Sequence, residues 1–149
     1  GGWDQKDSFK QRPDFFKTNN PPNREPDFID NIPTLPQSAL LYRLCGDMNP
    51  LHADPTVAKK AGFSRPILHG RCTMGIAIRS LIAKCCDYDA TKLTQISVRF
   101  SSPFLPGASL STKIWREHNN LYFESFDSES GTKVLSNGCA ILADSGTGN

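Results

Sequence analysis

The chain has 149 residues, and its 17 Lys and Arg nearly balance its 15 Asp and Glu. This balance argues against a nucleic-acid-binding protein, which needs a basic excess or basic stripes. The longest apolar stretch is interrupted by Arg79, Ser80 and Lys84, so we expect no membrane span. Five cysteines without a C-x-x-C motif, two of them adjacent at Cys85 and Cys86, favour a reduced compartment over a secreted protein.

The composition divides the chain into an arm, a domain and a tail. Residues 1–35 combine several prolines with charged clusters, which predicts an extended Pro-rich arm or linker. We expect the folded domain to occupy residues 36–143, with order beginning near Pro36. The polar residues 144–149 are expected to form a disordered tail, and no targeting signal is visible in them.

Local signals predict two short helices at the start of the domain. The first covers residues 37–44 and ends at Gly46. The second covers residues 55–61, with Asp54 as its N-cap and Gly62 as its stop. A loop joins the two.

The longest helix is predicted over residues 71–86. Its apolar side chains occupy two neighbouring rows, and its few polar side chains leave a wide apolar arc. Such an arc indicates a helix that is wrapped on most sides. The two rows are Met74, Ile78 and Ile82, and Ala77, Leu81 and Cys85.

After this helix, apolar residues alternate with a period of about two instead of about 3.6. A hairpin turn at Asn119-Asn120 and another turn at Gly131 separate the later strands. One long helix followed by antiparallel strands predicts an α+β domain whose sheet curls around the helix. The predicted strands cover residues 94–102, 109–118, 121–128 and 133–142.

The loop between the two short helices carries a candidate acid–base pair. Asp47, Asn49 and His52 are close in sequence, and Pro50 keeps the flanking helices from merging. The loop is therefore expected to aim Asp47 and His52 into one pocket, where a carboxylate and an imidazole that hold one water exchange its protons. By spacing alone, a helix cap and an ordinary polar contact remain the alternative for this pair.

The segment PILHG, residues 66–70, runs directly into the longest helix. The first N–H groups of a helix have no intrahelical partners, and the helix dipole is positive there. Because Gly70 has no side chain to shield its N–H, a carbonyl oxygen can approach it as in an oxyanion hole. The alternative is that Gly70 only eases the turn into the helix.

The block GDMNPLHADP, residues 46–55, resembles the signature of the (R)-specific enoyl-CoA hydratases, or hydratase 2. These enzymes form part of the MaoC-like branch of the hot-dog fold. The resemblance extends through AGF-x-x-PILHG, residues 61–70, and covers about residues 36–143. Cys45 departs from the pattern, because a Ser is more usual before the Gly-Asp pair.

The resemblance implies a hot-dog fold, in which a curved antiparallel sheet wraps a long central helix. It implies that Asp47 and His52 form the catalytic dyad, that Asn49 orients them, and that the N–H of Gly70 binds the thioester oxygen. The implied reaction is the reversible hydration of trans-2-enoyl-CoA to (3R)-3-hydroxyacyl-CoA in fatty-acid β-oxidation. The CoA thioester is the substrate, and no metal or other cofactor is implied.

The resemblance also implies a partner for this domain. Eukaryotic members resemble two hot-dog repeats in tandem, whereas bacterial members dimerise. We therefore expect either a homodimer or a second hot-dog repeat, with this chain as the catalytic C-terminal half. A peroxisomal location is implied by the eukaryotic form alone.

Several alternatives remain open from the residues. The same dyad would serve a dehydratase acting on acyl-carrier-protein thioesters, and the domain would also suit a non-catalytic CoA-binding half of a larger protein. A thioesterase fits the GDMNPLHADP block less well. His69 is expected to be a buried hydrogen-bonding partner of its loop, and His118 a surface residue at a strand end.

Overall fold

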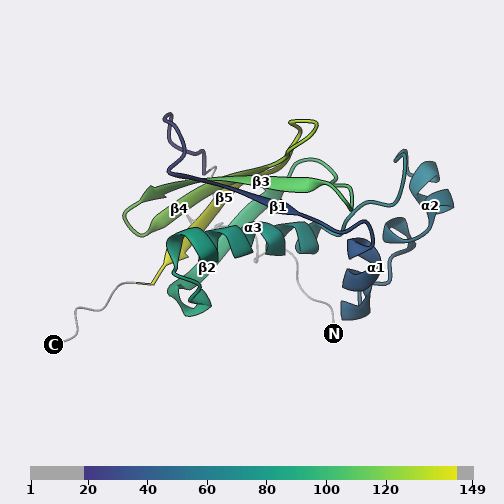
Figure 1. The fold of residues 1–149 in the computed structure, drawn as a ribbon, viewed down its shortest axis with the longest axis horizontal. Coiled ribbons are helices and arrows are strands. Elements are labelled where there is room, and N and C mark those ends of the chain that lie inside the picture. Colours follow the sequence, from purple (N-terminus) through teal and green to yellow (C-terminus); the bar gives the residue numbers. More distant parts are fainter. Residues whose placement is uncertain (1–18, 144–149) are drawn as a thin grey trace, which may run out of the picture.

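In the computed structural model, which describes residues 19–143, an open five-stranded sheet carries a long helix along one face (Figure 1). All strand pairings in this sheet are antiparallel, and the strand order is β1-β3-β4-β5-β2. This arrangement confirms the predicted α+β class. The strands are β1 (Phe28–Pro33), β2 (Leu93–Phe100), β3 (Ser109–Glu117), β4 (Asn120–Asp127) and β5 (Lys133–Leu142).

Strand β3 confirms the predicted alternation, whereas the burial along β2, β4 and β5 alternates less regularly. In β3, Leu110, Thr112 and Ile114 are fully buried, while the residues between them are only half-buried. A sheet covered on one face by a helix buries every second residue, so the pattern follows from the packing. Gly131, with a φ of 70°, lies in the turn between β4 and β5 as predicted.

The hairpin between β3 and β4 lies one residue earlier than predicted. Glu117 pairs with Asn120, so the two turn residues are His118 and Asn119. His118 takes a φ of 55°, in the left-handed region that tight hairpins require. The prediction of an Asn-Asn turn was therefore wrong in register, while the exposed position of His118 at the strand end is confirmed.

Strand β1 corrects the predicted arm. Phe28–Pro33 pair with β3, so ordered structure begins before the predicted boundary. Ahead of it, the indole N–H of Trp115 donates to the carbonyl oxygen of Arg24 at 2.8 Å. The edge of β3 offers unpaired backbone groups, and an edge strand tolerates proline, which explains why this Pro-rich segment joins the sheet. The rest of the predicted arm, residues 1–18, and the predicted tail, 144–149, lie outside the described residues.

The first predicted short helix is present but divided. Helix α1 (Ser38–Tyr42) passes into the 3-10 helix η2 (Arg43–Cys45), which ends at Gly46 with a left-handed φ of 109°. The following loop contains another 3-10 turn, η3 (Pro50–His52). The glycine stop was therefore predicted correctly.

The second predicted short helix is α2 (Pro55–Lys60). The Asp54 carboxylate accepts a hydrogen bond from the N–H of Thr56 at 2.7 Å, which confirms its predicted role as N-cap. Gly62 follows the helix with a φ of 89° and confirms the predicted stop. Local capping signals thus fix this helix.

The long helix α3 (Gly70–Cys85) starts one residue before its predicted position and is followed by the 3-10 turn η4 (Ala90–Lys92). One of its faces packs on the sheet, and the buried side chains on it are Thr73, Ala77, Ser80 and Leu81. The predicted wrapping on most sides is wrong for this chain, because an open sheet covers one side only. On the flank and the opposite side of the helix, Gly75 and Arg79 are exposed, and Met74, Ile78 and Ile82 are half-buried.

The core lies between α3 and the sheet, and it also receives residues from the chain that precedes α3. Ala39 of α1 and Leu68, just before α3, belong to the same buried cluster as Leu81 and Phe123. The N–H of Leu68 donates to the carbonyl oxygen of Phe104 at 2.7 Å. These contacts hold the start of α3 beside the loop that follows β2. Within residues 19–143, no helix has the length and apolar character to cross a membrane.

Candidate active site

The loop between η2 and α2 is shaped by its own polar side chains. The Asp47 carboxylate accepts a hydrogen bond from the N–H of Asn49 at 3.3 Å. The Asn49 side-chain oxygen accepts one from the N–H of Leu51 at 3.0 Å and so caps η3, which Pro50 begins. Asn49 therefore acts on His52 indirectly, by starting the turn that carries it.

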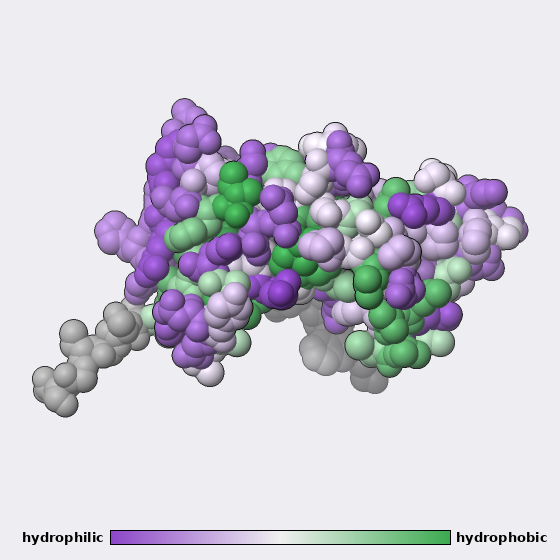
Figure 2. Space-filling model, viewed as in Figure 1, coloured by the Kyte–Doolittle hydropathy of each residue, from purple (hydrophilic) through white to green (hydrophobic). Residues whose placement is uncertain are grey.

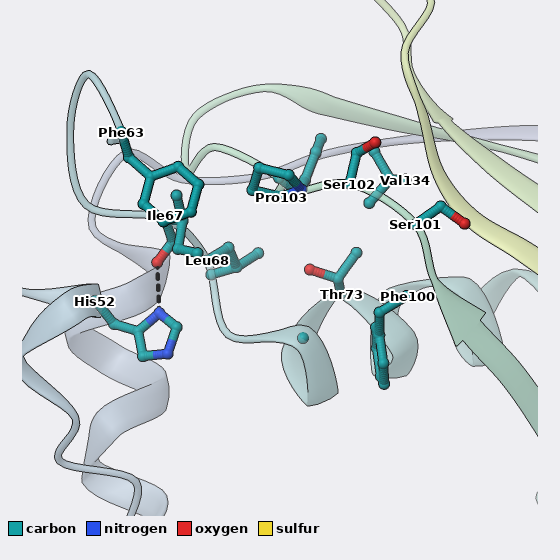
Figure 3. Close-up of a pocket in the computed structure, with 12 residues that line it drawn as sticks. His52, Phe63, Ile67, Leu68, Thr73, Phe100, Ser101, Ser102, Pro103 and Val134 are labelled. Carbon is teal, nitrogen blue, oxygen red and sulfur yellow. Dashed lines mark hydrogen bonds between the residues drawn. The ribbon is translucent and has the colours of Figure 1, made fainter. Parts of the chain in front are cut away.

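His52 is held by a backbone carbonyl from another segment. Its side chain is buried, and its Nδ1 lies 2.8 Å from the carbonyl oxygen of Ile67 (Figure 3). Because a carbonyl oxygen can only accept, Nδ1 carries a proton, and Nε2 is the ring nitrogen that can act as a base. This hydrogen bond fixes both the ring orientation and the nitrogen that is available as a base.

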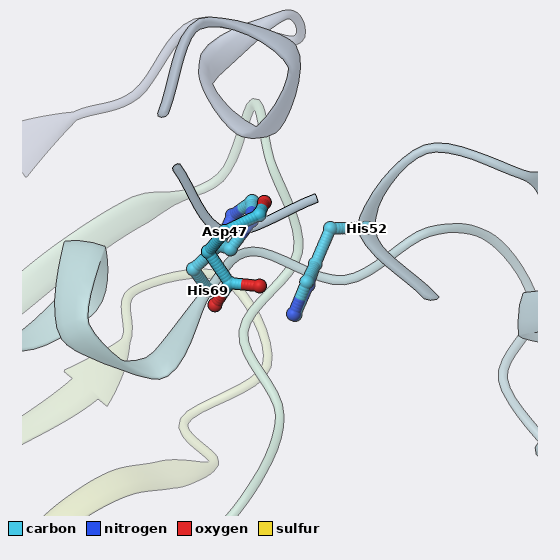
Figure 4. Close-up of side chains that lie close together, drawn as sticks. All are labelled: Asp47, His52 and His69. Atoms are coloured by element: carbon cyan, nitrogen blue, oxygen red, sulfur yellow. The ribbon is translucent and has the colours of Figure 1, made fainter. Parts of the chain in front are cut away.

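Asp47 and His52, from one loop, come together in space with His69, from the segment that begins α3 (Figure 4). One carboxylate oxygen or ring nitrogen of each lies within 4.8 Å of the others. Asp47 is exposed, whereas His52 and His69 are buried. The predicted juxtaposition of Asp47 and His52 is therefore present.

His69 is packed between the two predicted site residues. Its ring stacks on that of His52, with ring centroids 3.7 Å apart and an interplanar angle of 24°. Its Nε2 lies 3.2 Å from the carbonyl oxygen of Asp47, so Nε2 carries the proton and donates. Burial lowers the pKa of His69, which keeps its ring neutral. The Tyr42 ring packs nearby, at a centroid distance of 4.8 Å.

This arrangement confirms that His69 is a buried hydrogen-bonding residue, as predicted. Sequence reasoning missed its stacking on His52. The available signal was the position of His69 immediately before the first residue of α3, on the segment whose Ile67 carbonyl binds His52. That signal is visible only once residues 47–52 and 67–70 are known to meet.

A cavity of about 340 Å³ opens beside His52, between the start of α3 and the chain that leaves β2 (Figure 3). Its lining includes His52, Gly70 and Thr73, which carry polar groups. Most of the remaining lining is apolar and suits a hydrocarbon chain. It comprises Phe63, Ile67, Leu68, Phe100, Pro103, Phe104 and Val134, together with Ser101 and Ser102.

Gly70 occupies the position that was predicted for a thioester-binding amide. It is the first residue of α3, and no side chain caps that end of the helix. Its φ is not positive, so the backbone conformation does not require glycine there. A Cβ at Gly70 would lie 3.2 Å from Cε1 of Phe100, at the wall of the cavity. The lack of a side chain therefore keeps space open beside the amide, rather than easing a turn.

The three clustered residues do not form a good metal site. Each offers one ligand atom, but the His52 and His69 rings are stacked. The lone pairs of an imidazole lie in the plane of its ring, and two stacked rings have nearly parallel planes, which disfavours their pointing at one ion. Chemically, the site offers a carboxylate and a free imidazole nitrogen that can move protons, and an amide that can polarise a carbonyl.

Comparison with known proteins identifies the family to which this chain belongs. The family of MaoC like domains matches residues 17–138. The chain is 45% identical over 116 residues to the mouse peroxisomal multifunctional enzyme type 2, covering 78% of the chain and 16% of that protein. It is 46% identical over 114 residues to "Enoyl-CoA hydratase 2, peroxisomal" of Arabidopsis thaliana, covering 76% of the chain and 37% of that protein. The chain thus spans less than half of each relative.

A solved structure matches the fold over most of the chain. The full-length peroxisomal multifunctional enzyme type 2 of Drosophila melanogaster superposes with a TM-score of 0.85 and 36% identity. The match covers 90% of this chain and 25% of that one. The predicted hot-dog fold is confirmed. By sequence and by structure, the chain belongs to the MaoC-like domain family.

Proposed function

We propose that this domain adds water reversibly to trans-2-enoyl-CoA and gives (3R)-3-hydroxyacyl-CoA. The observation that carries this proposal is the meeting of acid–base and amide groups at one apolar cavity. His52 and Gly70 both line that cavity, and the Asp47 carboxylate lies beside His52. The name of the Arabidopsis relative, an enoyl-CoA hydratase 2, points to the same substrate class.

In the proposed reaction, Asp47 and His52 hold the attacking water between them. The water oxygen forms a bond to C3 of the enoyl group while one member of the dyad takes a water proton. The C2–C3 π bond breaks, and its electrons pass to the thioester oxygen as an enolate. The dyad then returns a proton to C2, so the product contains one added water and nothing else.

Gly70 has the proposed role of stabilising the enolate. Its N–H is at the positive end of α3 and has no intrahelical acceptor. A donor aimed at an oxygen that gains charge in the transition state is often worth about 3–4 kcal/mol. A hydrogen bond from this N–H also polarises the thioester carbonyl of the substrate, which makes C3 electrophilic. The proposed reaction therefore requires no further cofactor.

We propose that a second hot-dog unit, from another copy of the chain or from a neighbouring repeat, covers the apolar surface around α1. Hydrophobic side chains gather over α1 in Figure 2. Exposed apolar groups of this extent usually mark an interaction surface. The residues are Leu35, Leu40, Leu41, Leu44 and Met48, each more than half exposed.

The cellular setting is proposed from the relatives. The mouse and Arabidopsis proteins carry peroxisomal names. We propose that this domain likewise works in the peroxisome, where it hydrates enoyl-CoA during fatty-acid β-oxidation. Fractionation of cells that express the whole protein tests the location, and recovery in the cytosol alone would contradict it.

The function is tested with crotonyl-CoA and a longer trans-2-enoyl-CoA, followed through loss of the conjugated thioester absorbance. Chiral analysis of the product should give the (3R) alcohol, and an (S) product would overturn the proposal. The same enoyl groups on acyl carrier protein should react more slowly. Faster turnover on the carrier protein would favour the dehydratase alternative, and no turnover on either carrier would favour a non-catalytic thioester-binding half.

The partner is tested by analytical ultracentrifugation of the full chain. A dimer that is weakened by Leu41→Ser and Leu44→Ser would support a second copy on this surface, because both side chains are exposed in the single chain. A monomer that hydrates enoyl-CoA at full rate would contradict the need for any second unit.

A further inference from the structure

We propose that His69 is a positioning residue that fixes the position of Asp47 relative to the ring of His52. This inference rests on the proposed function, because it assigns His69 a task within the same site. His69 touches the two residues in different ways, through a hydrogen bond and through ring stacking. It therefore links two residues that the loop by itself does not connect.

The contact with Asp47 is made to the backbone. The Nε2–H of His69 donates to the carbonyl oxygen of Asp47 at 3.2 Å, which anchors the exposed loop to the start of α3. The Asp47 side chain accepts a hydrogen bond from the N–H of Asn49, in the same loop. The bond from His69 is thus what ties Asp47 to the rigid part of the fold.

The contact with His52 fixes the plane of the His52 imidazole ring. The Nδ1 hydrogen bond to Ile67 sets the ring direction but still permits the ring to tilt about that bond. Stacking on His69 at 3.7 Å supplies a flat wall that limits this tilt. The free Nε2 of His52 is then held at a constant angle toward the Asp47 carboxylate. Catalytic groups lose efficiency steeply when their geometry relaxes by about 1 Å.

The surroundings of His69 argue against a purely structural role. Its side chain is 1% exposed, and its Nδ1 is buried without a hydrogen-bond partner. A buried polar atom without a partner destabilises the folded state, so an apolar residue of similar size would suit this position better for stability alone. His69 is therefore expected to be kept for what its donor and its ring do to Asp47 and His52.

His69 does not belong to the wall of the cavity, among the lining residues that the structure describes. Its replacement should therefore leave substrate binding intact and reduce only the rate of the bound complex. A loss of kcat with unchanged KM is the signature of groups that act in the transition state alone. A residue that merely supports the fold would instead lower the amount of folded protein.

The test compares His69→Leu and His69→Gln with the parent in the full chain. His69→Leu removes both the donor and the flat ring, and kcat with crotonyl-CoA should fall about 10- to 100-fold while KM changes by less than about twofold. In His69→Gln, the side-chain amide reaches as far as Nε2 and can donate to Asp47. This variant should therefore recover part of the lost kcat, and the melting temperature of His69→Leu should equal or exceed that of the parent.

A second measurement does not depend on turnover. In ¹⁵N-labelled protein, the ring nitrogens of His52 and the backbone signals of Asp47 should shift or broaden in His69→Leu and return toward the parent in His69→Gln. Unchanged kcat, or a rise in KM alone, would overturn the positioning role. If the parent hydrates no thioester, the proposed function fails, and unchanged NMR signals in His69→Leu would then overturn this inference separately.

Discussion

The sheet with α3 and the helical segment of residues 38–62 are built on different principles. The sheet and α3 contribute most of the fully buried apolar side chains of the described chain. Residues 38–62 bury only Ala39, His52 and Ala58, and they expose several large apolar groups. One region therefore provides stability by itself, whereas the other depends on what it is packed against.

The candidate site lies where these two regions meet. The contacts across the junction are few and specific, chiefly the hydrogen bonds from His52 to Ile67 and from His69 to Asp47. A site built this way combines a rigid helix start with a loop that is held at a small number of points. Substitutions in the two regions are therefore expected to separate loss of stability from loss of activity.

The largest effect is expected in the stable region. Phe123 of β4 is fully buried. Phe123→Ala should lower the free energy of unfolding by about 3–5 kcal/mol, because it removes a large buried group and leaves a cavity. Chemical denaturation followed by circular dichroism measures this change.

The matched control for Phe123→Ala is Tyr88→Ala, since Tyr88 is an aromatic residue that is 79% exposed. It should change the free energy of unfolding by less than about 0.5 kcal/mol. Equal effects of the two substitutions would contradict the idea that burial of Phe123 stabilises this region.

In the helical segment, Asp47→Asn should damage activity without damaging the fold. Loss of an acid–base group lowers kcat by about 10²- to 10⁴-fold. The Asn oxygen can still accept the hydrogen bond from the N–H of Asn49, and the side chain is exposed, so the melting temperature should stay close to the parent value. Steady-state kinetics and thermal denaturation test both parts.

Asp54→Asn is the control for Asp47→Asn in the same loop. Asn caps a helix as well as Asp does, so both activity and stability should remain near the parent values. A large drop in the melting temperature of Asp47→Asn would instead make Asp47 a structural residue.

A smaller effect is expected at the junction itself, from Gly70→Ala. The added methyl group would lie 3.2 Å from the half-exposed Phe100 ring, which can yield. The fold should therefore be unharmed, while kcat/KM should fall about 10-fold because access to the amide is reduced. The rate of crotonyl-CoA hydration at low substrate concentration gives this value.

Gly75→Ala is the control for Gly70→Ala on the same helix. Apart from the neighbouring residues and the backbone of the helix itself, nothing lies within 4 Å of a Cβ at Gly75, so this change should stabilise α3 by about 0.5–1 kcal/mol and leave kcat/KM unchanged. Full activity in Gly70→Ala would remove the proposed role of the Gly70 amide.

The smallest effect concerns alkaline pH in the stable region. Burial raises the pKa of the Cys85 thiol from 9.0 to about 11. The folded protein thus holds this proton more tightly than the unfolded chain does, and the stability that it contributes is complete below about pH 9 and lost as pH rises through about 11. The melting temperature should fall over this range, and it should fall less in Cys85→Ala. Identical pH curves would contradict the assignment.

Much of the fold could be predicted from local signals. The Asp54 cap, the glycine stops and the alternation in β3 act within a few residues of the chain, so the short helices and later strands were recognisable. Strand β1 was missed because its sequence, FIDNIP, follows a Pro-rich stretch and shows no clear alternation. Its pairing with β3 joins residues that are far apart in sequence.

For the site, the sequence by itself determined the types of residue and their local placement. Gly46 and Pro50 turn the loop so that Asp47 and His52 lie close together, and Gly70 begins a helix. Only the tertiary structure decided that His69 stacks on His52 and that a carbonyl from another segment selects the free nitrogen of His52. The physical reason is that turns and caps arise from neighbouring residues, whereas ring stacking and tautomer choice depend on which distant segments the core brings together.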